Sequence, residues 1–351
     1  MTLQLFAHEE FDAHERVVFG FDAETGLRAL IAIHSTRLGP SLGGCRMYPY
    51  ADETAALTDV LRLSRGMSYK AALARLPQGG GKSVIIGDPR ADKSSALMRA
   101  MGRQVEALGG AYIVAEDSGI TVADVRAMAE ATGHVSGLAA PGAPGDGDPS
   151  PATAEGVYLA MQCCAERVLG ADSLLGVGVA IQGAGKVGTL LAGHLARAGA
   201  RLWISDVHGP SAEACAQATG AEVVPPDAIY DAPAEIFAPC AMGAVLNAGT
   251  IPRLQSRVVV GAANNQLARP EDDHRLLDAG VLYAPDYVVN AGGIIDIHYH
   301  RSGDYDPGAV RAHLATIPET LARILDTARA EDRPTGEVAD ALARAVIAGE
   351  R

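Results

Sequence analysis

The chain has 351 residues, which is enough for two domains with separate hydrophobic cores. Its content of 48% hydrophobic and 20% charged residues is typical of a folded globular protein and not of a disordered one. A net charge of −13 offers no positive footprint for nucleic acid or for an anionic membrane, so we expect neither as a partner.

Cysteine usage and the first residues bear on the cellular compartment. The opening MTLQLFAHEEFDAHE has no long apolar run, so neither a signal peptide nor a membrane anchor is predicted. The cysteines are odd in number and lack C-x-x-C spacing, which favours neither a disulfide framework nor a zinc site; they are Cys45, Cys163, Cys164, Cys215 and Cys240. We expect a cytoplasmic protein.

The first part of the chain predicts a mixed α/β domain. Apolar segments over 27–36, 82–88 and 111–117 predict strands. Apolar residues at helical spacing over 54–76 and 97–108 predict helices.

Residues 141–151, PGAPGDGDPSP, hold four prolines and three glycines and predict a domain boundary or hinge. We therefore predict a first domain over 1–142 and a second over 143–324. A C-terminal helix over about 325–351 could pack back onto the first domain.

The second domain alternates short apolar strands with helical stretches, which predicts a doubly wound parallel sheet. The predicted fold is thus α/β with two domains, one mixed and one of Rossmann type, separated by a cleft.

A glycine loop in the second domain predicts dinucleotide binding. Residues 183–188, GAGKVG, follow the strand VGVAIQ and open a helix that runs to Gly199. The three glycines allow a tight turn and close approach of a pyrophosphate, to which the helix N-terminus presents N–H donors. The residues expected at the cofactor are Gly183, Gly185, Lys186, Val187 and Gly188.

Asp206 ends the next strand, RLWISD, 18 positions after Gly188. A carboxylate there accepts hydrogen bonds from the adenosine ribose and repels a 2′-phosphate, which favours NAD over NADP. Nearby Lys186 and His208 leave weak NADP use open. The alternative for Asp206 is a helix N-cap, and for the loop a turn that is merely rich in glycine.

The segment PQGGGKSVI (77–85) is similar to a phosphate-binding P-loop but does not meet its pattern. That motif needs glycine at position 76, where this chain has Leu76, and it opens a helix, whereas VIIGDP continues as a strand. We predict that Lys82 begins this strand and does not bind a nucleotide phosphate.

Two lysines of the first domain predict a chemical site. Lys70 stands in GMSYKAA and Lys82 twelve residues later; either one alone would be read as a solvated surface residue. In one cleft, two ammonium groups depress each other's pKa, so one can act as a neutral base while the other binds a carboxylate. Glu116 and Asp117, after the third strand, offer an acidic partner or serve only as turn residues.

Seven segments, in order over about residues 20–345, resemble the amino acid dehydrogenase family of glutamate, leucine, valine and phenylalanine dehydrogenases. The resemblance is strongest to the leucine branch and next to the phenylalanine branch. The segments are IAIHSTRLGPSLGGCRM, LRLSRGMSYKAALARLPQGGGKSVIIGDPR, YIVAEDSGITVADV, GDPSPATAEGVY, IFAPCAMGAVL, GAANNQL and YAPDYVVNAGGII.

The resemblance implies reversible, NAD-dependent oxidative deamination of an L-amino acid to a 2-oxo acid and ammonia. It implies that Lys70 holds the substrate carboxylate and that Lys82 is the general base that activates water. Asp117 would then shuttle a proton and stabilise the substrate amine. It also implies substrate contacts from the backbone of Gly43 and Gly44.

For the second domain the resemblance implies that Asn264 fixes substrate and nicotinamide, and that Thr153 and Asn290 lie near the nicotinamide. It further implies a homo-oligomer assembled through the substrate domain. The relatives' side-chain pocket maps onto Leu42, Ala115, Ile294 and Ile297, although simple core packing is the alternative for each.

An aliphatic pocket argues against glutamate, because a buried carboxylate without a cation is costly. We expect leucine or another branched-chain substrate, with phenylalanine as the alternative, since one methylene contributes only about 1–3 kcal/mol of discrimination.

The segment IHYHRSGDYDP, after NAGGIID, departs from the leucine enzymes and puts the substrate preference in doubt. If it is helical, Asp296, His298 and His300 do not share one face, so we predict no metal site and favour a capping or subunit-contact role. Two competing functions remain at this stage: a lyase in which Lys82 forms a Schiff base, and a non-enzymatic NAD-sensing protein.

Overall fold

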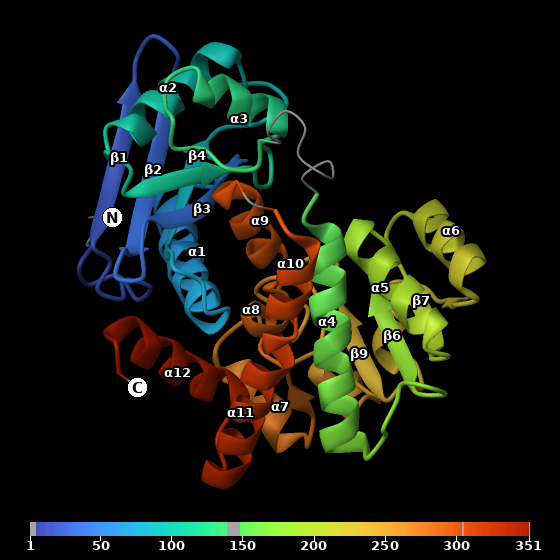
Figure 1. The fold of residues 1–351 in the computed structure, drawn as a ribbon. Coiled ribbons are helices and arrows are strands. Elements are labelled where there is room, and N and C mark those ends of the chain that lie inside the picture. Colours follow the sequence, from blue (N-terminus) through green and yellow to red (C-terminus); the bar gives the residue numbers. More distant parts are fainter. Residues whose placement is uncertain (1–4, 139–147, 304, 351) are drawn as a thin grey trace. The chain divides into compact units, whose positions relative to one another are not determined.

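The computed structural model describes residues 5–138, 148–303 and 305–350 and divides into two compact units (Figure 1). The first comprises Met1–Gly147, His300–Tyr305 and Ala343–Arg351, and the second Asp148–Tyr299 and Asp306–Leu342. Most of the predicted hinge at 141–151 lies outside the described residues.

The first unit contains a five-stranded mixed sheet in the order β1-β2-β4-β3-β5. β1 and β2 are antiparallel, as are β2 and β4, whereas β3 runs parallel to both β4 and β5. The strands are β1 (Arg16–Asp22), β2 (Leu27–Ser35), β3 (Ser41–Tyr48), β4 (Gly79–Ile86) and β5 (Tyr112–Ala115). The mixed α/β prediction for this part of the chain is confirmed.

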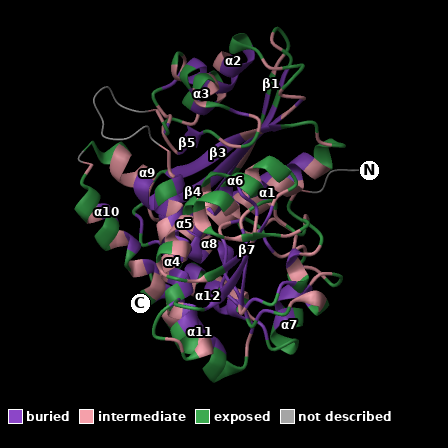
Figure 2. Cartoon of the chain, turned by 90° about the vertical axis from the view of Figure 1, so that its right-hand side faces the viewer, coloured by how far each residue is buried: buried purple, intermediate pink, exposed green. Residues whose placement is uncertain are grey.

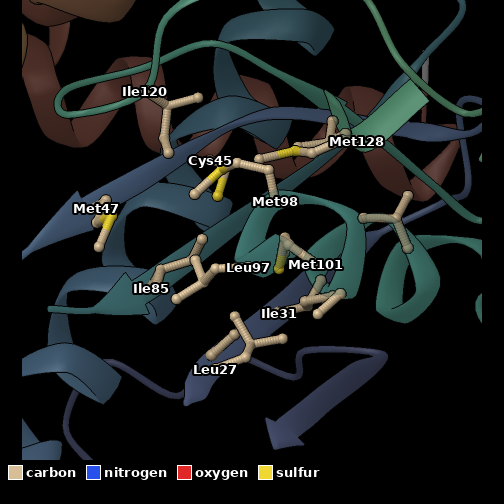
Figure 3. Close-up of a cluster of buried hydrophobic side chains, with 14 of the residues drawn as sticks. Leu27, Ile31, Cys45, Met47, Ile85, Leu97, Met98, Met101, Ile120 and Met128 are labelled. Atoms are coloured by element: carbon tan, nitrogen blue, oxygen red, sulfur yellow. The ribbon is translucent and has the colours of Figure 1, made fainter. Parts of the chain in front are cut away.

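Helices cover both faces of this sheet, and each face has its own core. The helices are α1 (Glu53–Leu73), α2 (Ser95–Glu106) and α3 (Val122–Ala129). Leu57, Val60 and Leu61 of α1 pack with Leu30 and Val84 on one face. On the other face, side chains of α2 and α3 pack with alternate strand residues, among them Leu27, Ile31, Cys45, Met47, Ile85, Leu97, Met98, Met101 and Met128 (Figure 3).

The prediction that Lys82 begins its strand was wrong, because β4 starts three residues earlier, at Gly79. The glycines pair with β2 and β3 as part of the strand, and they must be glycines because neighbouring backbone leaves no room for side chains. A Cβ at Gly79 would lie 2.0 Å from the Ser35 carbonyl oxygen, and one at Gly80 would lie 1.9 Å from the Ser68 nitrogen of α1. Lys82 therefore lies in the middle of a buried strand.

The second unit contains a six-stranded sheet in the order β11-β10-β9-β6-β7-β8, with all strands parallel. This is the strand order of a doubly wound dinucleotide-binding fold, which confirms the Rossmann prediction. The strands are β6 (Gly178–Gln182), β7 (Arg201–Ser205), β8 (Glu222–Val223), β9 (Ile236–Pro239), β10 (Val258–Val259) and β11 (Leu282–Tyr283).

The α-helices that follow the hinge region are α4 (Ser150–Cys164), α5 (Lys186–Arg197), α6 (Gly209–Thr219), α7 (Glu271–Asp278), α8 (Asp286–Val289), α9 (Gly292–Ser302), α10 (Pro307–Leu314), α11 (Thr316–Glu331) and α12 (Thr335–Ala348). Buried residues concentrate on the strands and exposed residues on outer helical turns such as those of α10 (Figure 2). None of the described helices is long and apolar enough to span a membrane.

The end of α12 belongs to the first unit. The Arg344 guanidinium lies 5.6 Å from the centre of the Tyr69 ring and 3.9 Å from the Asp12 carboxylate. The part of the C-terminal segment that packs on the first unit thus begins at Ala343.

Candidate active site and dinucleotide-binding site

Lys82 lies on the face of the first sheet that α1 covers. Side chains alternate along a strand, and Val84, two residues on, belongs to the core beneath α1. Lys70 lies in the last turn of the same helix and is half-buried. Lys82 itself is only 6% exposed, so its ammonium group needs a partner.

Three of the other predicted substrate residues share this face. Cys45 and Val114 point into the opposite core, so Leu42, Gly44 and Ala115 point to the Lys82 side. In the sheet register Gly44 lies beside Ala115, and Leu42 beside Gly80. Apolar groups therefore surround the lysine within the sheet.

Asp117, just after β5, is the partner of Lys82. The Lys82 Nζ lies 2.6 Å from Asp117 Oδ2, and the side chains are 8% and 23% exposed. A hollow of about 600 Å³ is lined by Glu116, Asp117 and residues of the loop that follows them. The pair itself is largely buried.

Arg46 is a second cation at the same carboxylate, and the sequence analysis missed it. Its Nε donates to Asp117 Oδ2 at 3.2 Å, and its Nη1 donates to Asp59 Oδ2 at 2.9 Å. Tyr50 also donates to that Asp59 oxygen, at 2.5 Å. A signal was present: Arg46 stands two positions after Gly44 on a strand and so points to the same face.

The two cations keep Asp117 ionised. Burial by itself would raise the pKa of this carboxyl, but Lys82 and Arg46 outweigh burial and hold the pKa of Asp117 below its usual value. The group is therefore a carboxylate at neutral pH and can accept hydrogen bonds there.

Gly43 and Gly44 allow strand and carboxylate to come this close. A Cβ at Gly44 would lie 2.7 Å from the Cβ of Asp117, and one at Gly43 would lie 1.7 Å from the Gly81 carbonyl oxygen. The Tyr112 hydroxyl donates to the Gly43 carbonyl at 2.8 Å and holds this backbone from the opposite face. Any larger residue would move either β3 or Asp117.

In the second unit the glycine loop joins β6 to α5, and Gly185 is the residue that precedes the helix. Gly183 has φ +109, and a Cβ at Gly188 would lie 2.0 Å from the Gly183 carbonyl oxygen. Apart from its chain neighbours, no described residue has an atom within 4 Å of the Cβ position of Gly185. The loop is thus packed tightly behind and open at the helix N-terminus.

Asp206 is tied to this loop. Its Oδ2 accepts from the Ala184 N–H at 2.7 Å, and its Oδ1 accepts from the His208 N–H at 2.8 Å. The N-cap alternative for Asp206 was wrong, because α6 begins at Gly209 and His208 takes the cap position. Lys186 pairs with Asp148 at 3.1 Å.

Asn264 and Asn290 are in direct contact. The Asn290 Nδ2 donates to Asn264 Oδ1 at 2.9 Å and to the Ala262 carbonyl at 3.1 Å. The Asn290 Oδ1 is buried and has no hydrogen-bond partner within the described parts of the chain. Thr153 lies close to the chain just after Asn290, since a Cβ at Gly293 would be 2.6 Å from the Thr153 Oγ1.

The last predicted residues lie on α9 of the second unit. Ile294 is buried and Ile297 half-buried, one helical turn apart. The segment of Asp296, His298 and His300 is indeed helical, and the described residues contain no group of three metal-ligating side chains. The His300 ring stacks on Tyr305 with centres 4.0 Å apart.

Comparison with known proteins identifies the family. The model of the Glu/Leu/Phe/Val dehydrogenase dimerisation domain matches residues 14–134, and that of the glutamate/leucine/phenylalanine/valine dehydrogenases matches 205–302. The chain belongs to this dehydrogenase family. The recognition made from sequence is confirmed, and neither a Schiff-base lyase nor an NAD sensor agrees with it.

Relatives of this dehydrogenase carry different substrate names. Leucine dehydrogenase of Bacillus cereus is 44% identical over 99% of this chain and 94% of its own length. Phenylalanine dehydrogenase of Lysinibacillus sphaericus is 44% identical over 96% and 90%. The crystal structure of L-tryptophan dehydrogenase from Nostoc punctiforme aligns with a TM-score of 0.83 at 40% identity, covering 96% of both chains. Membership therefore establishes an amino acid dehydrogenase, not its substrate.

NAD is the cofactor of this dehydrogenase. The residues present fit that molecule: the open N-terminus of α5 suits a pyrophosphate, and Asp206 stands beside the loop for a ribose. The buried Asn290 Oδ1 has no hydrogen-bond partner among the described residues, and a buried acceptor needs one. The carboxamide N–H of the nicotinamide is a donor of the kind that it lacks.

Proposed function

We propose that this enzyme catalyses the reversible, NAD-dependent oxidative deamination of an apolar L-amino acid, with leucine and other branched-chain substrates favoured. The buried Lys82–Asp117 pair, 2.6 Å apart on a sheet face shared with Leu42 and Ala115, carries the proposal. It combines a proton-transfer pair with apolar surroundings.

Each polar residue receives a separate task. Lys70 binds the substrate carboxylate as a fixed cation. Lys82, when neutral, takes a proton from water that attacks the iminium carbon, and Asp117 stabilises the substrate amine and transfers a proton to the departing ammonia. When bound, NAD supplies the acceptor for the hydride that leaves the substrate Cα. Asn264, Asn290 and Thr153 position the substrate and the nicotinamide.

The apolar preference follows from the side chains. Leu42 and Ala115 are 3% and 7% exposed and carry no charge. Ile294 and Ile297 of α9 supply further apolar surface in this proposal. Arg46, the cation on the same face, is already engaged by two carboxylates, so a glutamate side chain would lose its hydration without gaining a partner.

We also propose a homo-oligomer and a cytoplasmic location. The family model that matches residues 14–134 is described as a dimerisation domain. The edge strand β1 exposes Phe19 and Phe21 by 56% and 70%, which supports a contact with another subunit. The cysteines of the described chain are free thiols, as in a reducing compartment.

A substrate panel tests the function. Leucine, valine, isoleucine, phenylalanine, tryptophan and glutamate are each assayed for NADH formation, and separately for NADPH formation. We expect the highest kcat/KM for a branched-chain substrate with NAD, and a value for glutamate at least about 100-fold lower because its carboxylate is unpaired. A higher kcat/KM for phenylalanine or tryptophan would refute the proposed branched-chain preference. Absence of NADH formation with all six amino acids would refute the proposed function.

A further inference from the structure

We propose that Arg46 is a positioning residue for this reaction: it fixes the Asp117 carboxylate against Lys82 by binding the same carboxylate oxygen. The inference rests on the proposed roles of Lys82 and Asp117.

The contacts form one continuous chain. Asp117 Oδ2 receives both the Lys82 ammonium at 2.6 Å and the Arg46 Nε at 3.2 Å. The other end of the Arg46 guanidinium binds Asp59 at 2.9 Å, and Tyr50 donates to the same Asp59 oxygen. Asp59 lies on α1, Arg46 on β3 and Lys82 on β4, so three elements are tied to the loop that carries Asp117.

Only arginine suits this position. Its planar guanidinium directs two N–H groups at two carboxylates at once, whereas a lysine offers one point charge. The side chains of Arg46, Asp59 and Asp117 are each about a quarter exposed, at 24%, 24% and 23%. Water therefore screens these contacts only in part, and the charges influence one another strongly.

The charge of Arg46 acts on the Asp117 carboxyl. Together with Lys82 it holds the pKa of Asp117 below the usual value, against the effect of burial. Removal of this cation therefore raises the pKa of Asp117, and with it the pH at which the carboxylate takes up a proton. Loss of Asp59, an anion, has the opposite electrostatic sign. If Arg46 and Asp59 only linked α1 to β3 mechanically, loss of either side chain would break the link and would have the same effect on the pH profile.

The test compares pH profiles of kcat/KM for the best amino acid substrate. In Arg46→Met we expect the acid limb to move to higher pH and kcat at neutral pH to fall by at least about 10-fold, since misplaced groups lose catalytic contact. Arg46→Lys keeps the charge and should hold the limb near its wild-type position. Asp59→Asn should not move the limb to higher pH.

Arg65→Met is the matched control. The Arg65 side chain is 26% exposed, and its ion pair, 2.8 Å long, is with Glu10 and not with Asp117. Its profile should equal that of the wild type. Thermal unfolding verifies folding, and Arg46→Gln serves if the Met variant does not fold. An unchanged acid limb in Arg46→Met, or equal upward shifts in Arg46→Met and Asp59→Asn, would overturn the inference. A wild-type protein that forms no NADH would refute the proposed function instead.

Discussion

At the scale of single residues, the site depends on how a buried ammonium group is compensated. Lys82 is almost fully buried and touches one carboxylate, which Arg46 also contacts. Removing one member of a buried pair leaves its partner unpaired in a poorly hydrated place and commonly costs about 3–5 kcal/mol. The neighbouring side chains of Leu42 and Ala115 are apolar and cannot pair with the charge that is left. The cluster therefore combines chemistry with a constraint on stability.

Lys82→Ala should separate chemistry from cofactor binding. We expect turnover to fall by about 10²- to 10⁴-fold because the general base is lost, whereas NAD affinity should stay close to the wild-type value. Steady-state kinetics and an NADH binding titration measure the two quantities. The control Lys93→Ala breaks another lysine–aspartate pair of the same unit, the contact with Asp124 at 2.8 Å, and should retain turnover. Near-normal turnover in Lys82→Ala would contradict the base assignment.

At the scale of elements, glycines determine where strands and helices can approach. In β4, Gly79 and Gly80 admit the backbone of β2 and of α1. In α5, Gly188 packs on the backbone of the loop that precedes the helix. Gly193, five residues further, has no described atom within 4 Å of its Cβ position apart from its chain neighbours and the backbone of its own helix. Two glycines of one helix thus have very different surroundings.

Gly188→Ala and Gly193→Ala form a matched pair. Alanine favours the helix over glycine by up to about 1 kcal/mol at an interior position such as Gly193. At Gly188 the added Cβ would lie 2.0 Å from the Gly183 carbonyl oxygen, so α5 must shift, which should lower stability by about 1–3 kcal/mol and weaken NAD binding at least 10-fold. At Gly193 stability should rise and NAD binding should not change. Urea unfolding and NADH titration give both values; equal behaviour of the variants would exclude the steric explanation.

At the scale of the whole molecule, the two units should respond oppositely to acid. In the first, burial and the neighbouring His14 lower the pKa of His34 to about 4 although Asp12 acts the other way. In the second, burial raises the pKa of Asp273 to about 6, which the Gly336 N–H and His274 oppose. At a pH between about 4 and 6.5, His34 therefore binds fewer protons in the folded first unit than in the unfolded chain. At a pH between 3.8 and about 6, Asp273 binds more protons in the folded second unit than in the unfolded chain.

The sign of the pH effect follows from this difference in proton binding. As pH falls from 7 to 5, the first unit should lose about 1–3 kcal/mol through His34, while the second should gain a similar amount through Asp273. Trp203, the single tryptophan, lies on β7 and reports the second unit by fluorescence; circular dichroism reports both. His34→Gln should remove the loss and Asp273→Asn the gain. Parallel pH dependence of the two units in the wild type would contradict this assignment.

Much of this enzyme could be predicted from its sequence, because the decisive patterns are local. The glycine loop, the acidic residue at the end of β7 and the alternation of strands with helices lie within short segments, and they led to the Rossmann fold and to NAD. Lys82 and Asp117 were found in the same way, through segments typical of the family.

Only the tertiary structure decided the rest, because it depends on residues that meet across elements. Arg46 and Asp117 are 71 positions apart, and Arg46 donates to the Asp117 carboxylate only because β3 and β5 are neighbours in the sheet. The glycines before Lys82 are part of its strand, and they allow the backbones of β2 and α1 to come so close that a Cβ would not fit. The sequence by itself determined the fold class and the cofactor and led to the residues proposed to react, whereas packing determined which charges surround them, since burial and electrostatic coupling arise only when distant segments come together.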